Sequence, residues 1–241
     1  MRTVNIYGDT NVGQKRENNE DAFLLQKIWD NNHILAVVID GVGGYEGGEV
    51  AAEIACKTIV NYLTEFPDGE VLSLLKQAVT QANNNIIENK KYNAAYANMA
   101  CVLTACLIEL SDNKLNMVHV GDTRLYSYSG KILEKLSHDH SPIGHQEEIG
   151  ELSEEAAMSH PDRNLINRSV GSDFHNVGDF DFLEAQTFLL LSNATYLLCS
   201  DGLYDMLMAS EIISVLDADI SMKDKTNALI GYANEKGGKD N

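Results

Sequence analysis

The chain has 241 residues, of which 44% are hydrophobic and 22% are charged, a balance typical of globular proteins and not of disordered or fibrous ones. Its 36 acidic and 18 basic residues give a formal net charge of −18, which repels nucleic acid and anionic lipid and favours a soluble monomer. No apolar run is long enough to cross a membrane and no signal pattern opens the sequence, so we expect a cytoplasmic protein.

The cysteines do not follow a metal-binding or redox spacing. Cys56, Cys101, Cys106 and Cys199 form no C-x-x-C pair, and three of them lie in apolar runs. This pattern predicts buried free thiols in a reducing compartment, and it argues against a zinc site.

The first part of the chain predicts one strand followed by two helices. Leu35–Ile39 is a short apolar run between turn residues, which is typical of a buried strand. Apolar residues then recur at helical spacing from Glu46 to Phe66, where Pro67 ends the pattern, and again from Glu70 to Lys90.

Short strands crowd together in the rest of the chain. We expect them at residues 99–110, 114–120, 124–129, 131–136, 165–170, 188–191 and 196–199. A polar stretch from His145 to His160 predicts short helices or a flap, and helices near Ser210–Leu216 and Lys223–Glu235 close the chain. Closely spaced hairpins beside helix pairs predict antiparallel sheets in one α+β domain spanning residues 1–241.

Acidic side chains stand at the ends of several predicted strands. These positions are Asp21, Asp40, Asp122 and Asp201, with Glu20 next to the first. A single Asp-Gly pair would indicate only a turn, but carboxylates at neighbouring strand ends converge on one cleft and repel unless a cation lies between them. Oxygen ligands without a Cys or His pattern favour Mg²⁺ or Mn²⁺.

Two other groups near this set bear on the chemistry. Gly41 follows Asp40 and lets the backbone approach an ion, so its carbonyl is a candidate ligand. Arg16 lies just upstream of Asp21, and a guanidinium can bind a phosphate through two parallel hydrogen bonds. The alternative for Arg16 is a surface ion pair with Glu17 or Glu20.

Seven short segments follow one another in an order that is specific when taken together. They are Arg16–Ala22 (R-x-x-N-E-D-A), Asp40–Gly44 (D-G-x-G-G), Gly121–Arg124 (near G-D-S-R), Leu136–Ser141 (near T-x-D-H-S), His160–Arg168 (near H-P-x-R-N-x-I-T-R), Cys199–Leu203 (S-D-G-L) and Lys239–Asn241 (D-N). With them the chain resembles, over nearly its whole length, the type-2C or PPM family of metal-dependent serine/threonine protein phosphatases in its short bacterial form.

The resemblance implies a four-layer α/β/β/α sandwich, in which two antiparallel sheets are flanked by helix pairs and two Mn²⁺ or Mg²⁺ ions lie between the sheets. Asp40 would bridge the two ions. Asp201 and Asp240 would complete the shell of one ion, and the Gly41 carbonyl would bind the other.

The resemblance also implies roles for four further residues. Glu20 and Asp21 would lie in the inner or outer metal shell, Asp122 would help to hold a weaker third ion, and Arg16 would bind the substrate phosphate. The implied reaction is hydrolysis of phosphoserine or phosphothreonine in proteins by a metal-bridging hydroxide, with no covalent enzyme intermediate. The implied partners are phosphorylated proteins and an opposing serine/threonine kinase with its substrates.

The sequence departs from the family pattern in three places. Val42 stands where eukaryotic members often have a histidine that protonates the leaving group. Met99–Val102 replaces an M-G-T-T segment, a change that affects packing more than chemistry. The family usually continues beyond the segment that matches Asn241 into another strand, so we expect either an incomplete sheet or a chain that is trimmed after this segment.

Val42 leaves open the source of the proton for the leaving serine oxygen. A metal-bound water is one source, and a histidine is the other, with His138, His140 and His160 as candidates. Three other functions also remain open: a hydrolase for a small phosphoester, a phosphoprotein-binding pseudophosphatase and an acidic structural protein.

Overall fold

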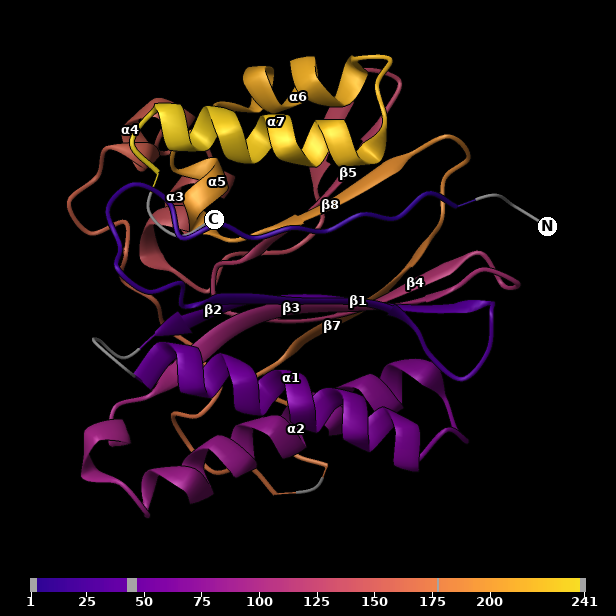
Figure 1. Ribbon diagram of the computed structural model, residues 1–241, viewed down its shortest axis with the longest axis vertical. Helices are drawn as coiled ribbons and strands as arrows, with labels where there is room; N and C mark the ends of the chain where they lie inside the picture. The colour runs from indigo at the N-terminus through magenta and orange to yellow at the C-terminus, as the bar shows by residue number, and fades with distance from the viewer. Residues whose placement is uncertain (1–3, 43–46, 177, 239–241) are drawn as a thin grey trace.

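The computed structural model describes residues 4–42, 47–176 and 178–238, and these residues build four layers. Two antiparallel sheets pack face to face, one helix pair covers the outer face of each sheet, and short helices lie at one end of the sandwich (Figure 1). This arrangement confirms the α/β/β/α fold that the sequence predicts.

The strands divide between a larger and a smaller sheet. In spatial order, the five-stranded sheet contains β1 (Asp21–Lys27), β2 (His33–Val42), β3 (Ala100–Glu109), β4 (Lys114–Val120) and β7 (Glu184–Leu189), and the three-stranded sheet contains β6 (Ile132–Lys135), β5 (Arg124–Ser129) and β8 (Thr195–Cys199). Each neighbouring pair in both sheets is antiparallel.

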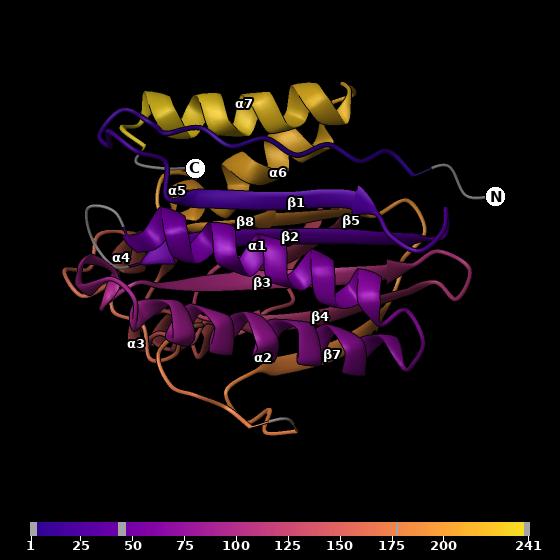
Figure 2. The ribbon, with the colours of Figure 1, turned by 60° about the horizontal axis from the view of Figure 1, so that its bottom comes forward.

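The helices comprise one pair on each sheet and a set of short helices at one end of the sandwich. They are α1 (Gly47–Glu65), α2 (Val71–Lys90), the 3-10 turn η1 (Ala94–Tyr96), α3 (Pro142–Glu148), α4 (Glu154–Met158), α5 (Asp201–Tyr204), α6 (Ala209–Asp217) and α7 (Met222–Glu235). Figure 2 shows α1 and α2 covering one face of the five-stranded sheet. The α2 helix begins after Glu70 because that carboxylate accepts hydrogen bonds from the backbone N–H groups of Leu72 and Ser73. No helix in the described ranges is both long and apolar enough to reach across a bilayer.

Strand alternation separates the apolar core from the acidic side chains. In β2, Val37 and Ile39 are buried in the cluster against α1 and α2, whereas Ala36 belongs to the cluster between the sheets. Because successive side chains point to opposite faces, Asp40 lies on the face toward the second sheet. The sequence therefore directs apolar residues outward to the helices and a carboxylate inward to the gap between the sheets.

Most expected elements agree with the structure, but one expected strand is absent from the described residues. Residues 165–170 form no strand, and only Val170 pairs, through a bridge to Cys101. The chain crosses from one sheet to the other between β4 and β5, so these consecutive strands do not pair with each other. Gly121, with φ of +102°, makes this crossing, and such a conformation is rarely open to other residues.

The polar stretch expected as short helices or a flap contains α3 and α4. Both are tied to the rest of the domain by acidic side chains. Glu147 pairs with Arg124 at 2.6 Å, and Glu154 accepts a hydrogen bond from the backbone N–H of Ala209 at 2.6 Å.

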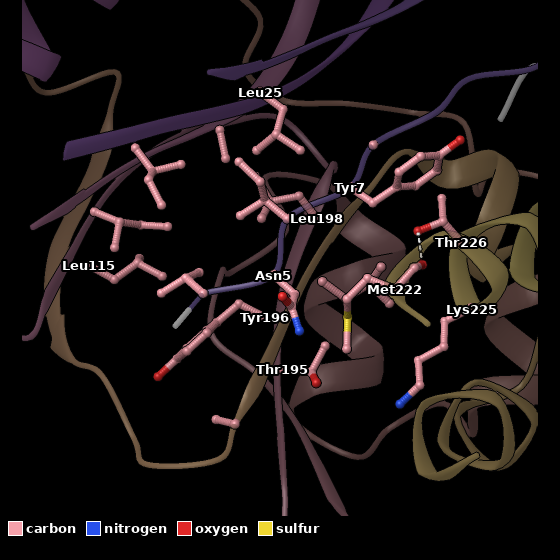
Figure 3. Close-up of a pocket in the computed structure, with 18 of the residues that line it drawn as sticks. Asn5, Tyr7, Leu25, Leu115, Thr195, Tyr196, Leu198, Met222, Lys225 and Thr226 are labelled. Carbon is pink, nitrogen blue, oxygen red and sulfur yellow. Dashed lines mark hydrogen bonds between the residues drawn. The ribbon is translucent and has the colours of Figure 1, made fainter. Parts of the chain in front are cut away.

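A cavity of about 660 Å³ lies along β8, which is an edge strand of the smaller sheet. Its walls come from extended residues 4–9, from both sheets and from α7 (Figure 3). Leu25 and Leu115 line the side of the larger sheet, whereas Met222 and Thr226 line the side of α7. The lining is mainly apolar and lies apart from the acidic residues described next.

Candidate active site

The acidic site starts from the pairing of β1 with β2. Asp21 lies directly opposite Asp40, so both side chains point to the same face of the sheet. Just before this pair, the backbone N–H of Gly41 donates to the carbonyl of Glu20 at 3.1 Å. Glu20 and Asp21 are buried, with 6% and 9% of their surface exposed. One end of the sheet therefore carries three carboxylates, a charge concentration that needs compensation.

Two glycines, Gly41 and Gly48, pack closely against each other next to these carboxylates. A Cβ atom built on Gly41 would lie 2.4 Å from the carbonyl atoms of Gly48, at the start of α1. A Cβ on Gly48 would lie 2.7 Å from the carbonyl of Gly41 and 3.0 Å from the carboxyl carbon of Glu20. The first turn of α1 can approach the end of β2 only because both positions lack side chains.

The second sheet brings Asp201 to the same place. Asp201 is the first residue of α5, which directly follows β8. The preceding residue, Ser200, donates a hydrogen bond from its Oγ to Oδ2 of Asp21 at 2.5 Å. Residues that are 179 positions apart in sequence therefore meet across the gap between the sheets.

Asp122 lies on the crossing between the two sheets and is 8% exposed. Burial first, and then the negative charges of Asp201 and Asp139, raise its pKa to about 7 against the lowering effect of Arg124. The hydroxyl of Tyr204, on the same helix as Asp201, donates to the carbonyl of Asp122 at 3.0 Å. Asp122 and Asp201 thus belong to one electrostatic cluster.

Arg16 lies at the rim of this cluster. Its Nη1 is 3.0 Å from Oε2 of Glu20, and its side chain is 46% exposed whereas that of Glu20 is 8% exposed. The structure therefore contains the ion pair that the sequence offers as an alternative. The same contact holds the guanidinium at the edge of the acidic site, where a phosphate could reach it.

Of the predicted site residues, the structure thus brings together Arg16, Glu20, Asp21, Asp40, Gly41, Asp122 and Asp201. Asp240 lies outside the described residues, as do Gly43 and Gly44 of the glycine-rich segment.

Comparison with known proteins decides the family. The family described as protein phosphatase 2C matches residues 10–235. The chain belongs to the protein phosphatase 2C family. The protein phosphatase PhpP of Streptococcus pneumoniae is 32% identical over 237 residues, which cover 96% of this chain and 92% of PhpP.

Solved structures give the same result for the fold. The serine/threonine phosphatase of S. agalactiae superposes with a TM-score of 0.82 at 27% identity, over 96% of this chain and 93% of the other. The catalytic domain of the phosphatase PstP, solved in complex with two manganese ions, superposes with a TM-score of 0.80 at 26% identity, over 96% and 92% of the two chains. The resemblance read from the sequence is confirmed.

The residues of this 2C-family phosphatase fit divalent cations. The converging side chains offer carboxylate oxygens, which hard cations such as Mg²⁺ and Mn²⁺ prefer. Burial, and next the negative charges of Asp201 and Asp139, raise the pKa of Asp122, so a cation beside it would offset the cost of its charge.

The three candidate histidines occupy different surroundings. The His138 side chain is exposed, and its Nδ1 lies 3.0 Å from Oε1 of Glu184. Nδ1 of His160 accepts a hydrogen bond from the backbone N–H of Asp162 at 3.1 Å. Nδ1 of His140 accepts the backbone N–H of Gly121 at 3.1 Å. Each ring thus has one nitrogen engaged in a local contact.

Three residues that shape the phosphatase site were missed by the sequence reasoning. Gly48 packs against Gly41, Ser200 bonds to Asp21, and Tyr204 supports Asp122. Ser200 and Tyr204 flank Asp201 within one helical turn, which is the signal that could have identified them. Nothing in the local sequence of Gly48 indicates its contact, which depends on how α1 docks.

Proposed function

We propose that this phosphatase hydrolyses phosphoserine and phosphothreonine side chains of other proteins. The observation that supports this proposal is the meeting of Asp21, Asp40, Asp122 and Asp201 between the two sheets, with Arg16 at the rim. The relatives described as serine/threonine phosphatases also support it.

The metal-binding residues would divide between three ions. Asp40, Asp201 and Asp240, with the Gly41 carbonyl, would hold two Mn²⁺ or Mg²⁺ ions, and Asp122 would help to hold a weaker third ion. When bound, the ions would supply hydroxide at neutral pH as the nucleophile and offset the charge of the phosphoryl group.

The remaining residues would position these groups and the substrate. Glu20 and Asp21 would complete the inner or outer shell, where Ser200 fixes one oxygen of Asp21. Arg16 would orient the phosphoryl oxygens through charge-assisted hydrogen bonds. Because water is the attacking group, the reaction needs no serine, cysteine or histidine nucleophile and forms no covalent enzyme intermediate.

The proposed substrates are phosphorylated proteins in the cytoplasm, including those of an opposing serine/threonine kinase. A pseudophosphatase is disfavoured because the predicted acidic set within the described residues is intact. A hydrolase for a small phosphoester would use the same groups, so the choice between them rests on substrate comparison.

The decisive experiment measures phosphate release from a phosphothreonine peptide with Mn²⁺, with Mg²⁺ and with chelator, beside a set of small phosphoesters. We expect metal-dependent turnover and preference for the peptide. Asp40→Asn should abolish most activity and weaken both ions together, whereas Asp112→Asn, on an exposed turn between β3 and β4, should change neither. Full turnover by Asp40→Asn would exclude the two-metal site.

A further inference from the structure

Two histidines form hydrogen bonds with the backbone N–H and carbonyl of Gly121. Its carbonyl accepts a hydrogen bond from Nε2 of His119 at 3.0 Å and another from the backbone N–H of His140 at 2.6 Å. Its own N–H donates to Nδ1 of His140 at 3.1 Å. The two rings lie 5.0 Å apart, centroid to centroid. The N–H and the carbonyl of this one residue are therefore both hydrogen-bonded, to His119 in β4 and to His140 in the loop between β6 and α3.

A second set of hydrogen bonds leads from His119 to Thr123, the residue after Asp122. Nδ1 of His119 is 2.9 Å from Oγ1 of Thr104, which is 2.7 Å from Oγ1 of Thr123. Because the carbonyl of Gly121 can only accept, Nε2 of His119 carries the proton and Nδ1 accepts the Thr104 hydroxyl proton. Thr123 then donates to Thr104, so the residues on both sides of Asp122 are tied into one chain of hydrogen bonds.

The fold explains why these residues meet. Thr104 and His119 are direct partners in the pairing of β3 with β4, so their side chains share the face toward the second sheet. Gly121 then crosses between the sheets with its Cα against Val102, where a Cβ would lie 2.1 Å from the Val102 side chain. The crossing cannot be held by a side chain at 121, and hydrogen bonds to its backbone take that role.

The two histidines are neutral in the folded chain. Burial, with a smaller effect of the neighbouring ring, lowers the pKa of His119 to about 3. Burial, with a smaller effect of Arg168, lowers the pKa of His140 to about 4. A neutral His140 ring whose Nδ1 accepts from Gly121 carries its proton on Nε2.

A metal ion is a poorer account of this cluster. Ligand atoms of His119, His140 and Glu184 lie within 4.8 Å of one another, close enough for an ion to bridge. However, both ring nitrogens of His119 are engaged, and the Glu184 carboxylate accepts from the backbone and ring of His138, each at 3.0 Å. An ion would have to break these contacts.

We propose that His140 and His119 are positioning residues that clamp the Gly121 peptide and so fix the Asp122 carboxylate for the weaker cation. This role rests on the proposed function of Asp122 as a metal ligand. Tyr204 donates to the Asp122 carbonyl, so hydrogen bonds hold the backbone on both sides of the Asp122 side chain. Groups that orient a metal ligand typically change metal affinity by about 10–100-fold when they are removed.

The test compares His140→Leu, which removes the acceptor, with His140→Asn, whose amide oxygen can replace Nδ1. Calorimetric titration with Mn²⁺ should show the weakest binding class lost or weakened by about tenfold or more in His140→Leu, and kept within about threefold in His140→Asn. The Mn²⁺ concentration for half-maximal peptide hydrolysis should shift likewise, while KM for the peptide stays within about twofold. His33→Leu is the matched control, because His33 lies at the other end of β2, about 23 Å from Asp40 along the strand.

A nitrogen NMR measurement of the metal-free wild-type protein tests the clamp without any variant. We expect both rings as neutral Nε2–H tautomers at pH 7. An Nδ1–H tautomer at His140, or wild-type Mn²⁺ binding in His140→Leu, would overturn the proposal. If the wild-type protein released no phosphate in any metal, the proposed function would fail, whereas the tautomer and the Mn²⁺ titration would still decide the clamp.

Discussion

Ser200 and Asp21 form a hydrogen bond of 2.5 Å that joins the two sheets at the acidic site. Both residues are buried, with 3% and 9% of their surface exposed. A hydrogen bond to a buried carboxylate contributes more than one between neutral groups, and its loss leaves that carboxylate less well solvated. This contact therefore connects the stability of the sandwich with the geometry of the metal ligands.

Ser200→Ala should reduce the free energy of unfolding by about 1.5–3 kcal/mol, because the charged acceptor loses its donor. Urea unfolding of the metal-free protein measures this change. Ser214→Ala is the control, since Ser214 is exposed and its hydroxyl donates to the carbonyl of Ser210 within the same helix. Equal stability of the two variants would show that the bond between the sheets contributes little.

Arg16→Ala should raise KM for a phosphopeptide by about tenfold or more while changing Mn²⁺ affinity little, since one charge-assisted contact to phosphate is lost. Arg16→Lys should recover part of this loss, because lysine keeps the charge but not the two-pronged geometry. Steady-state kinetics and Mn²⁺ titration on the same preparations distinguish the two effects. Loss of metal affinity at constant KM would assign Arg16 to the support of Glu20 alone.

That acidic side chains would lie near one another could be read from the sequence because strand alternation is a local property. Asp21 precedes one apolar run and Asp40 follows another, and antiparallel pairing of those runs places the two carboxylates opposite each other. The path of the chain after Val120 could not be predicted in this way. The Gly121 crossing depends on contacts with Val102 and His140, which are distant in sequence, and residues 165–170 lie near strand β3 without joining it beyond Val170.

Gly48→Ala should damage both folding and metal binding, because the new methyl group would lie 2.7 Å from the Gly41 carbonyl and 3.0 Å from the Glu20 carboxyl carbon. Gly231→Ala in α7 is the matched control. A Cβ there meets no atom within 4 Å, and alanine should stabilise that helix by about 0.5–1 kcal/mol. Thermal unfolding with and without Mn²⁺ measures both variants. A Gly48→Ala protein as stable and as responsive to Mn²⁺ as wild type would show that α1 can move away from β2 at no cost.

Asp122→Asn should stabilise the metal-free protein while slowing turnover. Burial and the charges of Asp201 and Asp139 raise the pKa of Asp122 to about 7, above its ordinary value of 3.8. A carboxyl group whose folded pKa is raised binds its proton more tightly in the folded state, so stability falls as pH rises from about 4 to 7 and the full penalty persists above pH 7.

The difference in melting temperature between Asp122→Asn and wild type should therefore be small at pH 4 and several degrees at pH 8 in chelator. For a chain of this size, each kcal/mol of relief corresponds to about 2–4 °C. Saturating Mn²⁺ should reduce or reverse the difference, because an ion compensates the charge only where the carboxylate is present. The same gain in melting temperature at both pH values would mean that charge repulsion at Asp122 is not its cause.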